Sequence, residues 1–162
     1  MKAYRKLNKL TDKQKLEFVK KQISFIGCDI NLKRIGDNNM RIDATSNFNN
    51  NKKAIFSIEF GNDYVSVPRK ILEDFAVFHN RYNIIKENIV PFSILKNLPS
   101  KRSEYYQIID DIKDVTNISI YTLTFKAIEN IKINRKTIYD FNLNEFFISK
   151  KNYRYRFIKN NL

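Results

Sequence analysis

Hydrophobic residues recur with helical spacing near the start of the chain. One apolar face is formed by Leu16, Val19, Ile23 and Ile26. Thr11 and Gln14 precede this face in a capping-box pattern, and Gly27 follows it as a C-terminal stop. We therefore predict a first helix over residues 12–26. Its solvated face carries three lysines, Lys13, Lys20 and Lys21.

From residue 28 the pattern changes to strict alternation, which is typical of strands with one buried face. Residues 28–33 and 40–44 alternate on either side of the turn Gly36–Asn39, and this order predicts a hairpin. Residues 56–60 and 64–67 flank a second turn and predict a second hairpin. Two hairpins would form a small antiparallel sheet.

Helical spacing returns at Pro68, a residue that suits a first helical turn, and continues to the region of Asn83. The residues that carry this spacing are Ile71, Phe75, Phe78 and Tyr82. Residues 91–98 predict a short helix, and Ser100 is placed to cap a third one. The apolar positions of the third helix are Tyr105, Ile108, Ile109 and Ile112.

The last part of the chain is rich in Ile, Tyr, Phe and Thr. Residues 118–125, 131–139 and 153–157 read as strands, and residues 141–149 are compatible with either a helix or a strand. We expect an α+β fold in which three to four helices accompany an antiparallel sheet of β-hairpins. The chain would form a single compact domain over residues 1–162.

Charge adds a functional indication to this pattern. The 162 residues include 30 Lys and Arg against 17 Asp and Glu, a net charge of +13, whereas solubility of a small domain needs a net charge of only about 2 to 8. The surplus is concentrated in residues 1–27 and 116–162. Basic ends that converge on one surface would bind a polyanion, so the expected partner is nucleic acid or a nucleic-acid-bound protein. A solubilising charge coat and an anionic membrane surface are the alternatives.

Several classes of chemistry are excluded. The single Cys28 cannot form an internal disulfide or a paired-thiol zinc site, and we expect it to be a small buried residue. With His79 as the only histidine, HExxH sites and paired-histidine sites are impossible. The absence of Gly from residue 62 onward removes phosphate-binding loops there. We expect no cofactor and no catalytic residues.

The hydropathy pattern indicates a cytoplasmic protein without a membrane partner. The longest uncharged stretch, residues 115–125, is far shorter than a membrane span of about 20 residues. Thr11 and Asp12 stand where the apolar part of a secretory signal would lie.

A winged helix-turn-helix is the first candidate for nucleic-acid binding. It would consist of the helix at residues 91–98, the third helix, and a strand pair whose turn near Glu129 forms the wing. Lys101 and Arg102 begin the third helix and aspartates end it, the reverse of the order that the helix dipole favours. A phosphate at the helix start would explain this order, with Tyr106 and Gln107 reaching into a groove. The alternative is an ordinary helix pair that closes the core.

The second candidate is the basic C-terminal stretch. Its cations are Lys150, Lys151, Arg154, Arg156 and Lys159. In a strand, Tyr153, Tyr155 and Phe157 would point to the core while the arginines line a phosphate backbone. A basic outer face without a ligand is the alternative.

A metal-dependent nuclease is a further alternative. Asp43 and Glu59 lie on neighbouring predicted strands, and two hard oxygen ligands can position Mg²⁺ and a water molecule, as in restriction-type nucleases. The lysine expected two residues after the second acid is missing, because Gly61 stands there. Solvent-facing strand acids explain the pair equally well.

The sequence therefore predicts a non-catalytic nucleic-acid-binding protein. A DNA-binding regulator or a replication accessory protein of a phage or other mobile element fits the basic charge and the abundance of Asn, Ile and Lys, which have AT-rich codons. An inhibitor of a nucleic-acid-guided defence enzyme, of the anti-CRISPR type, is an alternative.

Overall fold

The computed structural model describes residue 7, residues 9–33 and residues 42–152. Within them, five strands form one sheet in chain order: β1 (Ile30–Leu32), β2 (Ala44–Asn47), β3 (Lys53–Glu59), β4 (Ile89–Leu95) and β5 (Tyr121–Thr124). The pairs β1–β2 and β2–β3 are antiparallel, while β3–β4 and β4–β5 are parallel. The sheet is therefore mixed, and the expectation of a purely antiparallel sheet was wrong.

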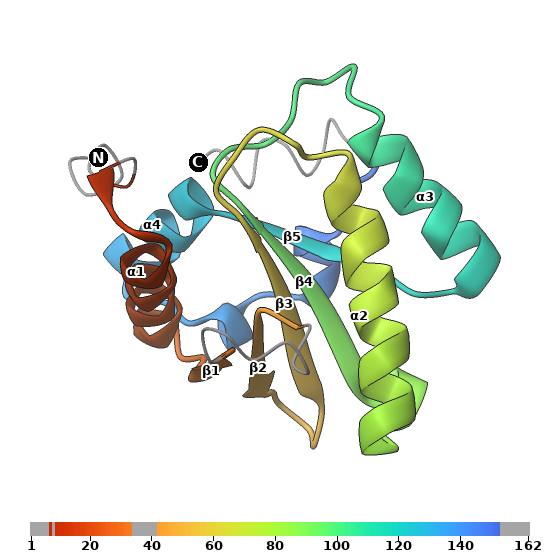
Figure 1. The fold of residues 1–162 in the computed structure, drawn as a ribbon, viewed down its shortest axis with the longest axis horizontal. Coiled ribbons are helices and arrows are strands. Elements are labelled where there is room, and N and C mark those ends of the chain that lie inside the picture. Colours follow the sequence, from red (N-terminus) through yellow and green to blue (C-terminus); the bar gives the residue numbers. More distant parts are fainter. Residues whose placement is uncertain (1–6, 8, 34–41, 153–162) are drawn as a thin grey trace.

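Helices cover both faces of the sheet (Figure 1). One face is covered by α2 (Ser66–Tyr82) and α3 (Tyr105–Thr116), and the other by α1 (Asp12–Phe25) and α4 (Phe125–Ile133). The sheet separates two hydrophobic cores, one beneath each helical layer. Short 3₁₀ helices, η2 (Lys86–Asn88), η3 (Ile138–Asp140) and η4 (Leu143–Phe146), complete the described elements.

The central strand β4 explains why the hairpin expectation failed. All seven residues of β4 are buried, and Val90, Phe92 and Ile94 enter the α1/α4 core while Ile89 and Leu95 enter the α2/α3 core. A parallel strand covered by helices on both faces is hydrophobic along its whole length. Such a run resembles a buried helix in sequence, so the short helix expected at residues 91–98 is a strand.

The antiparallel strand pairing expected for the first hairpin is present, and the second hairpin is not formed. β1 pairs with β2, with Ile30 opposite Ser46, although β2 begins at Ala44, where the second strand was expected to end; residues 34–41 lie outside the described part. Residues 64–67 do not return as a strand but lead into α2, which carries the chain across to β4. Residues 131–139 contain the end of α4 and part of η3, so no strand forms there. Without the short helix and the wing strands, there is no winged helix-turn-helix in this region.

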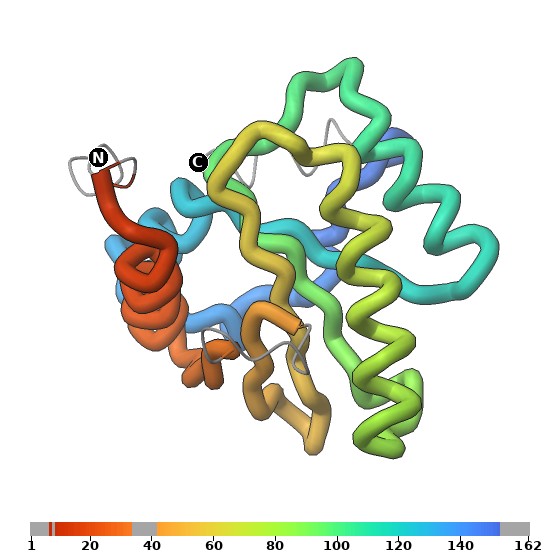
Figure 2. The backbone as a smooth tube through the Cα atoms, in the orientation of Figure 1, coloured from red at the N-terminus to blue at the C-terminus, as the bar shows by residue number. Residues whose placement is uncertain are grey.

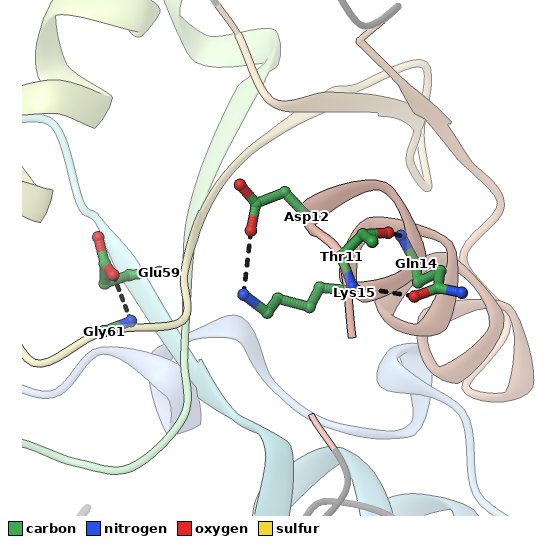
Figure 3. A network of polar contacts seen from close by, with 6 residues as sticks. All are labelled: Thr11, Asp12, Gln14, Lys15, Glu59 and Gly61. Atoms are coloured by element: carbon green, nitrogen blue, oxygen red, sulfur yellow. Dashed lines mark hydrogen bonds and ion pairs between the residues drawn. The ribbon is translucent and has the colours of Figure 1, made fainter. Parts of the chain in front are cut away.

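The first helix begins as its sequence predicts. Thr11 N donates to Gln14 Oε1 at 2.9 Å and Gln14 N donates to Thr11 Oγ1 at 3.3 Å, which completes the capping box (Figure 3). After Phe25 the chain reverses at Gly27, whose φ of +86° is open to glycine but costly for other residues. This reversal leads the chain from α1 into the edge strand β1, which contacts the helix.

A buried polar cluster fixes α3 on the sheet. The Tyr105 hydroxyl lies 2.7 Å from Ser93 Oγ on β4 and 2.7 Å from Thr122 Oγ1 on β5. All three side chains are fully buried. Hydrogen bonds inside the cluster replace those that the hydroxyl groups would make with water, so burial of the polar atoms is compensated.

Candidate nucleic-acid interface

Lys101 and Arg102 lie in the loop between β4 and α3, not at the start of the helix. The helix begins at Tyr105, and Glu104 occupies the N-cap position without a side-chain capping bond. Both cations are exposed. The expected phosphate site on the exposed N–H groups of a helix that starts with these two residues is therefore not formed as predicted.

Tyr106 does not face solvent. Its side chain is 1% exposed and its hydroxyl donates to the Pro99 carbonyl oxygen at 2.7 Å. Gln107 is half-buried and its Nε2 donates to Asp111 Oδ1 at 2.8 Å. Tyr106 thus packs in the α2/α3 core, and the expectation that it reaches into a DNA groove was wrong.

Lys150 and Lys151 lie against α3. The backbone nitrogen of Lys150 donates to the Tyr106 carbonyl, and that of Lys151 donates to Asp110 Oδ2. The Nζ atom of Lys151 lies 2.6 Å from Asp114 Oδ2, and this hydrogen bond raises the pKa of Lys151. An internal carboxylate therefore neutralises Lys151. The remaining predicted cations of this stretch, Arg154, Arg156 and Lys159, lie outside the described residues.

The predicted site cations of the two ends do not converge in the part that the structure describes. Lys13, Lys20 and Lys21 are exposed on α1, on one face of the sheet, whereas Lys150 and Lys151 sit beside α3 on the other face. The sequence shows where charge lies along the chain but not which layer each segment joins. A single surface that contains both of these lysine groups is thus not found there.

Charge is instead divided between the two helical layers. The helix α1 carries four lysines and two acids, and residues 125–136 carry four basic residues and one acid. The helices α2 and α3 together carry four basic residues and five acids. α1 and α4 contact each other, and Lys132 Nζ lies 3.9 Å from the centroid of the Phe25 ring. We call α1 together with residues 125–136 the basic layer.

The described residues also form a groove of about 470 Å³ at one side of the basic layer, between α1 and the edge strand β1. Within it, the helical spacing of seven residues puts Lys13 and Lys20 on one face of α1. Lys33 follows β1, and its backbone nitrogen donates to the Asp43 carbonyl oxygen. We call this the lysine groove; it is lined by Lys13, Leu16, Glu17, Lys20, Asn31, Leu32 and Lys33. Sequence reasoning found Lys13 and Lys20 but missed Lys33, because only the fold brings β1 beside α1.

The two acids of the nuclease alternative lie close to the same region of β3. Asp43 Oδ2 accepts a hydrogen bond from Ile58 N at 2.9 Å and lies 2.7 Å from Lys70 Nζ of α2. Glu59 Oε1 accepts from Gly61 N (Figure 3). Since Ile55 enters the α2/α3 core and Phe56 the α1/α4 core, alternation puts Glu59 on the α2 face as well. In the described part of the chain, no three His, Cys, Asp or Glu side chains are arranged to hold a metal ion.

Comparison with protein-family models, with curated proteins and with solved structures found no match to this chain. Among the described residues, no helix combines the length and the apolar character needed to cross a membrane.

Proposed function

We propose that the protein binds nucleic acid without catalysis, through the basic layer. The observation that carries this proposal is the unequal charge of the helices in the two layers: α1 and residues 125–136 together carry eight basic residues against three acids, whereas α2 and α3 carry four against five. A charge coat that served only solubility would have no reason to favour one side. A polyanion would be attracted to the side with the excess.

Binding of this kind rests on phosphate neutralisation. Each lysine that contacts a phosphate releases condensed counterions, which makes the affinity strongly dependent on salt and largely independent of sequence. Apart from the half-buried Lys15, the lysines of the basic layer are exposed, and only three acids lie among its basic residues. A DNA-binding regulator or replication accessory protein of a mobile element, as the sequence suggested, would use this surface to hold the nucleic acid.

The test is a comparison of two triple variants by fluorescence anisotropy with a labelled duplex over a series of salt concentrations. Replacing Lys21, Lys126 and Lys136 of the basic layer by Gln should reduce the slope of log affinity against log salt concentration by about 2 to 3, because each lost phosphate contact reduces this slope by about 0.9. The matched control replaces Lys101, Arg102 and Lys150 on the other side, and should bind as the wild type does. If the control loses affinity and the first variant does not, the binding surface is the β4–α3 loop and the proposal fails. No binding of this duplex or of a labelled single strand at low salt would contradict it altogether and leave a protein partner, as in the inhibitor interpretation.

A second candidate function is metal-dependent hydrolysis of nucleic acid. The observation that favours it is the position of Lys70, whose Nζ atom lies 2.7 Å from Asp43 Oδ2. The helix α2 thereby supplies an ammonium group beside Asp43, although the lysine expected two residues after Glu59 is replaced by Gly61. Two carboxylates can hold a divalent ion, and a nearby ammonium group can stabilise the negative charge that develops on the phosphate.

This candidate is tested by incubation of labelled single-stranded and duplex DNA with Mg²⁺ or Mn²⁺, with a chelator as the blank. Hydrolysis that is lost in Asp43→Asn, Glu59→Gln and Lys70→Met, but kept in the exposed control Asp63→Asn, would establish a nuclease. Absence of cleavage, or cleavage that survives these three substitutions, would contradict it.

A further inference from the structure

The lysine groove combines three cations with an apolar floor. We call its two half-buried leucines, Leu16 and Leu32, the apolar floor; the exposed Lys13 and Lys20 and the half-buried Lys33 line the same groove. We infer that the groove binds a single strand of nucleic acid, with phosphates at the three ammonium groups and the apolar faces of the nucleotides on the two leucines. The inference rests on the proposed function, because it names the part of the surface that holds one strand.

The spacing of the lysines suits consecutive phosphates. Lys13 and Lys20 are two helical turns apart, about 10 Å along α1 at 1.5 Å per residue. Lys33 approaches from β1, across the groove from α1, and its backbone hydrogen bond to Asp43 fixes its position. A strand in the groove would therefore meet cations on both sides, and separate phosphates could each contact a different lysine.

Among the described residues, these lysines differ from Lys15, Lys70 and Lys151 in having no carboxylate as an ion-pair partner. Lys15 pairs with Asp12, Lys70 with Asp43 and Lys151 with Asp114, at Nζ–Oδ distances of 2.6 to 3.0 Å. Within the ranges that the structure describes, no carboxylate lies within ion-pair distance of Nζ of Lys13, Lys20 or Lys33. Their charge is therefore available to an external anion.

The apolar floor distinguishes a single strand from a duplex. A duplex keeps its bases stacked inside and presents mainly phosphates and groove edges, so it would leave Leu16 and Leu32 without a contact. An unpaired strand exposes the faces of its bases and sugars, which can cover an apolar surface while the backbone follows the cations. The volume of about 470 Å³ lies within the range of about 300 to 1,000 Å³ typical of small-ligand sites, which suits a nucleotide or two.

Glu17 gives the inference a directional test. It is exposed on α1, four residues after Lys13 and three before Lys20, and it lines the same groove. Its carboxylate repels any phosphate that the lysines attract. Replacement by Gln keeps the size of the side chain and removes the charge, so Glu17→Gln should strengthen binding of a single strand.

The experiment measures anisotropy of a fluorescent oligothymidine and of a labelled duplex with the full chain over a salt series. The groove variant carries Lys13→Gln, Lys20→Gln and Lys33→Gln, and the matched control carries Lys21→Gln, Lys126→Gln and Lys136→Gln, each checked by circular dichroism. For oligothymidine, the slope of log affinity against log salt concentration should be smaller by about two in the groove variant than in the wild type, because each lost phosphate contact reduces this slope by about 0.7. The control should lose less affinity for this probe, and Glu17→Gln should bind it more tightly than the wild type.

The outcomes separate the inference from the proposed function. If the wild type binds both probes and the groove variant binds oligothymidine as well as the control does, the groove is not the site, although the basic layer still binds nucleic acid. If the groove variant loses affinity for duplex and oligothymidine to the same extent, the preference for a single strand is overturned. If the wild type binds neither probe, both proposals fail.

Discussion

The carboxylate of Asp43, the residue before β2, links α2 and β3 through contacts with Lys70 and Ile58. Its Oδ2 atom lies 2.7 Å from Lys70 Nζ on α2 and accepts a hydrogen bond from the backbone nitrogen of Ile58 on β3. The ladder between β2 and β3 ends with the pair Ala44–Phe56, so Ile58 N lies beyond it. The side chain of Asp43 therefore takes over where backbone pairing stops.

This arrangement predicts unequal costs for its two partners. Asp43→Ala leaves Ile58 N without its acceptor and should lower the free energy of unfolding by about 1 to 3 kcal/mol. Lys70→Ala removes only a half-exposed ion pair and should cost no more than about 1 kcal/mol. Urea denaturation of both variants measures the difference, and a larger loss for Lys70→Ala would show that the ion pair, not the backbone hydrogen bond, is the main contribution.

The surroundings of Gly27 and Gly61 indicate that these two glycines differ in how well they tolerate replacement by alanine. At Gly27, φ is +86° and an added Cβ would lie 3.2 Å from two Thr137 side-chain atoms, so Gly27→Ala should cost about 1 to 2 kcal/mol. At Gly61 the close atom is Glu59 Oε1, at the end of a flexible side chain. Gly61→Ala should therefore change the unfolding free energy little. Thermal unfolding of the pair tests this ranking, which equal losses would refute.

The capping box at the start of α1 predicts a measurable loss on truncation. Thr11→Ala removes the acceptor for Gln14 N and should lower the free energy of unfolding by about 1 kcal/mol. Thr11→Ser keeps the hydroxyl and should stay close to the wild type. Chemical denaturation of the two variants is the measurement, and an unaffected Thr11→Ala would mean that packing on the sheet alone holds this end of the helix.

Burial of Tyr105 predicts a loss of stability at high pH. Desolvation raises the pKa of its hydroxyl from 10 to about 12, against the lowering effect of the hydrogen bonds to Ser93 and Thr122. The unfolded chain therefore loses this proton first, so stability is unchanged below about pH 10 and falls up to about pH 12, by about 2 to 3 kcal/mol in total.

The control for this effect is Tyr105→Phe, which has no proton to lose. At neutral pH it should be less stable by about 1 to 2 kcal/mol, because Ser93 and Thr122 lose a partner. Between pH 10 and 12 the difference in stability between the two proteins should shrink to zero and then reverse, because the wild type loses more than this difference. Parallel curves over that range would contradict the proposed pKa.

Local pattern was sufficient for α1 and α2, but it missed α4, which lies where a strand pair and its turn were expected, and it was insufficient for the sheet. The capping box, the apolar face of α1 and the spacing of Ile71, Phe75 and Phe78 in α2 placed these helices to within a few residues. Strand β4 was not predicted because burial on both faces removes the alternation of apolar and polar residues by which strands are recognised. Tyr64 begins the connection that crosses to β4 through α2, but the local sequence resembles the second strand of a hairpin.

The candidate site was only partly visible in the sequence. Lys13 and Lys20 are seven residues apart in one helix, so their shared face follows from spacing alone. The fold brings Lys33 to the same groove, and it brings Lys70 to Asp43, which is 27 positions away in the sequence. Both placements depend on the order in which strands and helices are assembled. Tyr106 was misplaced because a tyrosine at a helix start has the same sequence appearance whether its ring points to a core or to a ligand.

In the described part of the chain, the uneven charge of the helices in the two layers corresponds to an electric dipole across the plane of the sheet. In the field of an approaching polyanion, a body with such a dipole rotates before it touches, and the α1/α4 side turns toward the opposite charge. Long-range attraction thus orients the protein before it touches the polyanion. The short-range contacts on that side then only hold a complex that is already aligned.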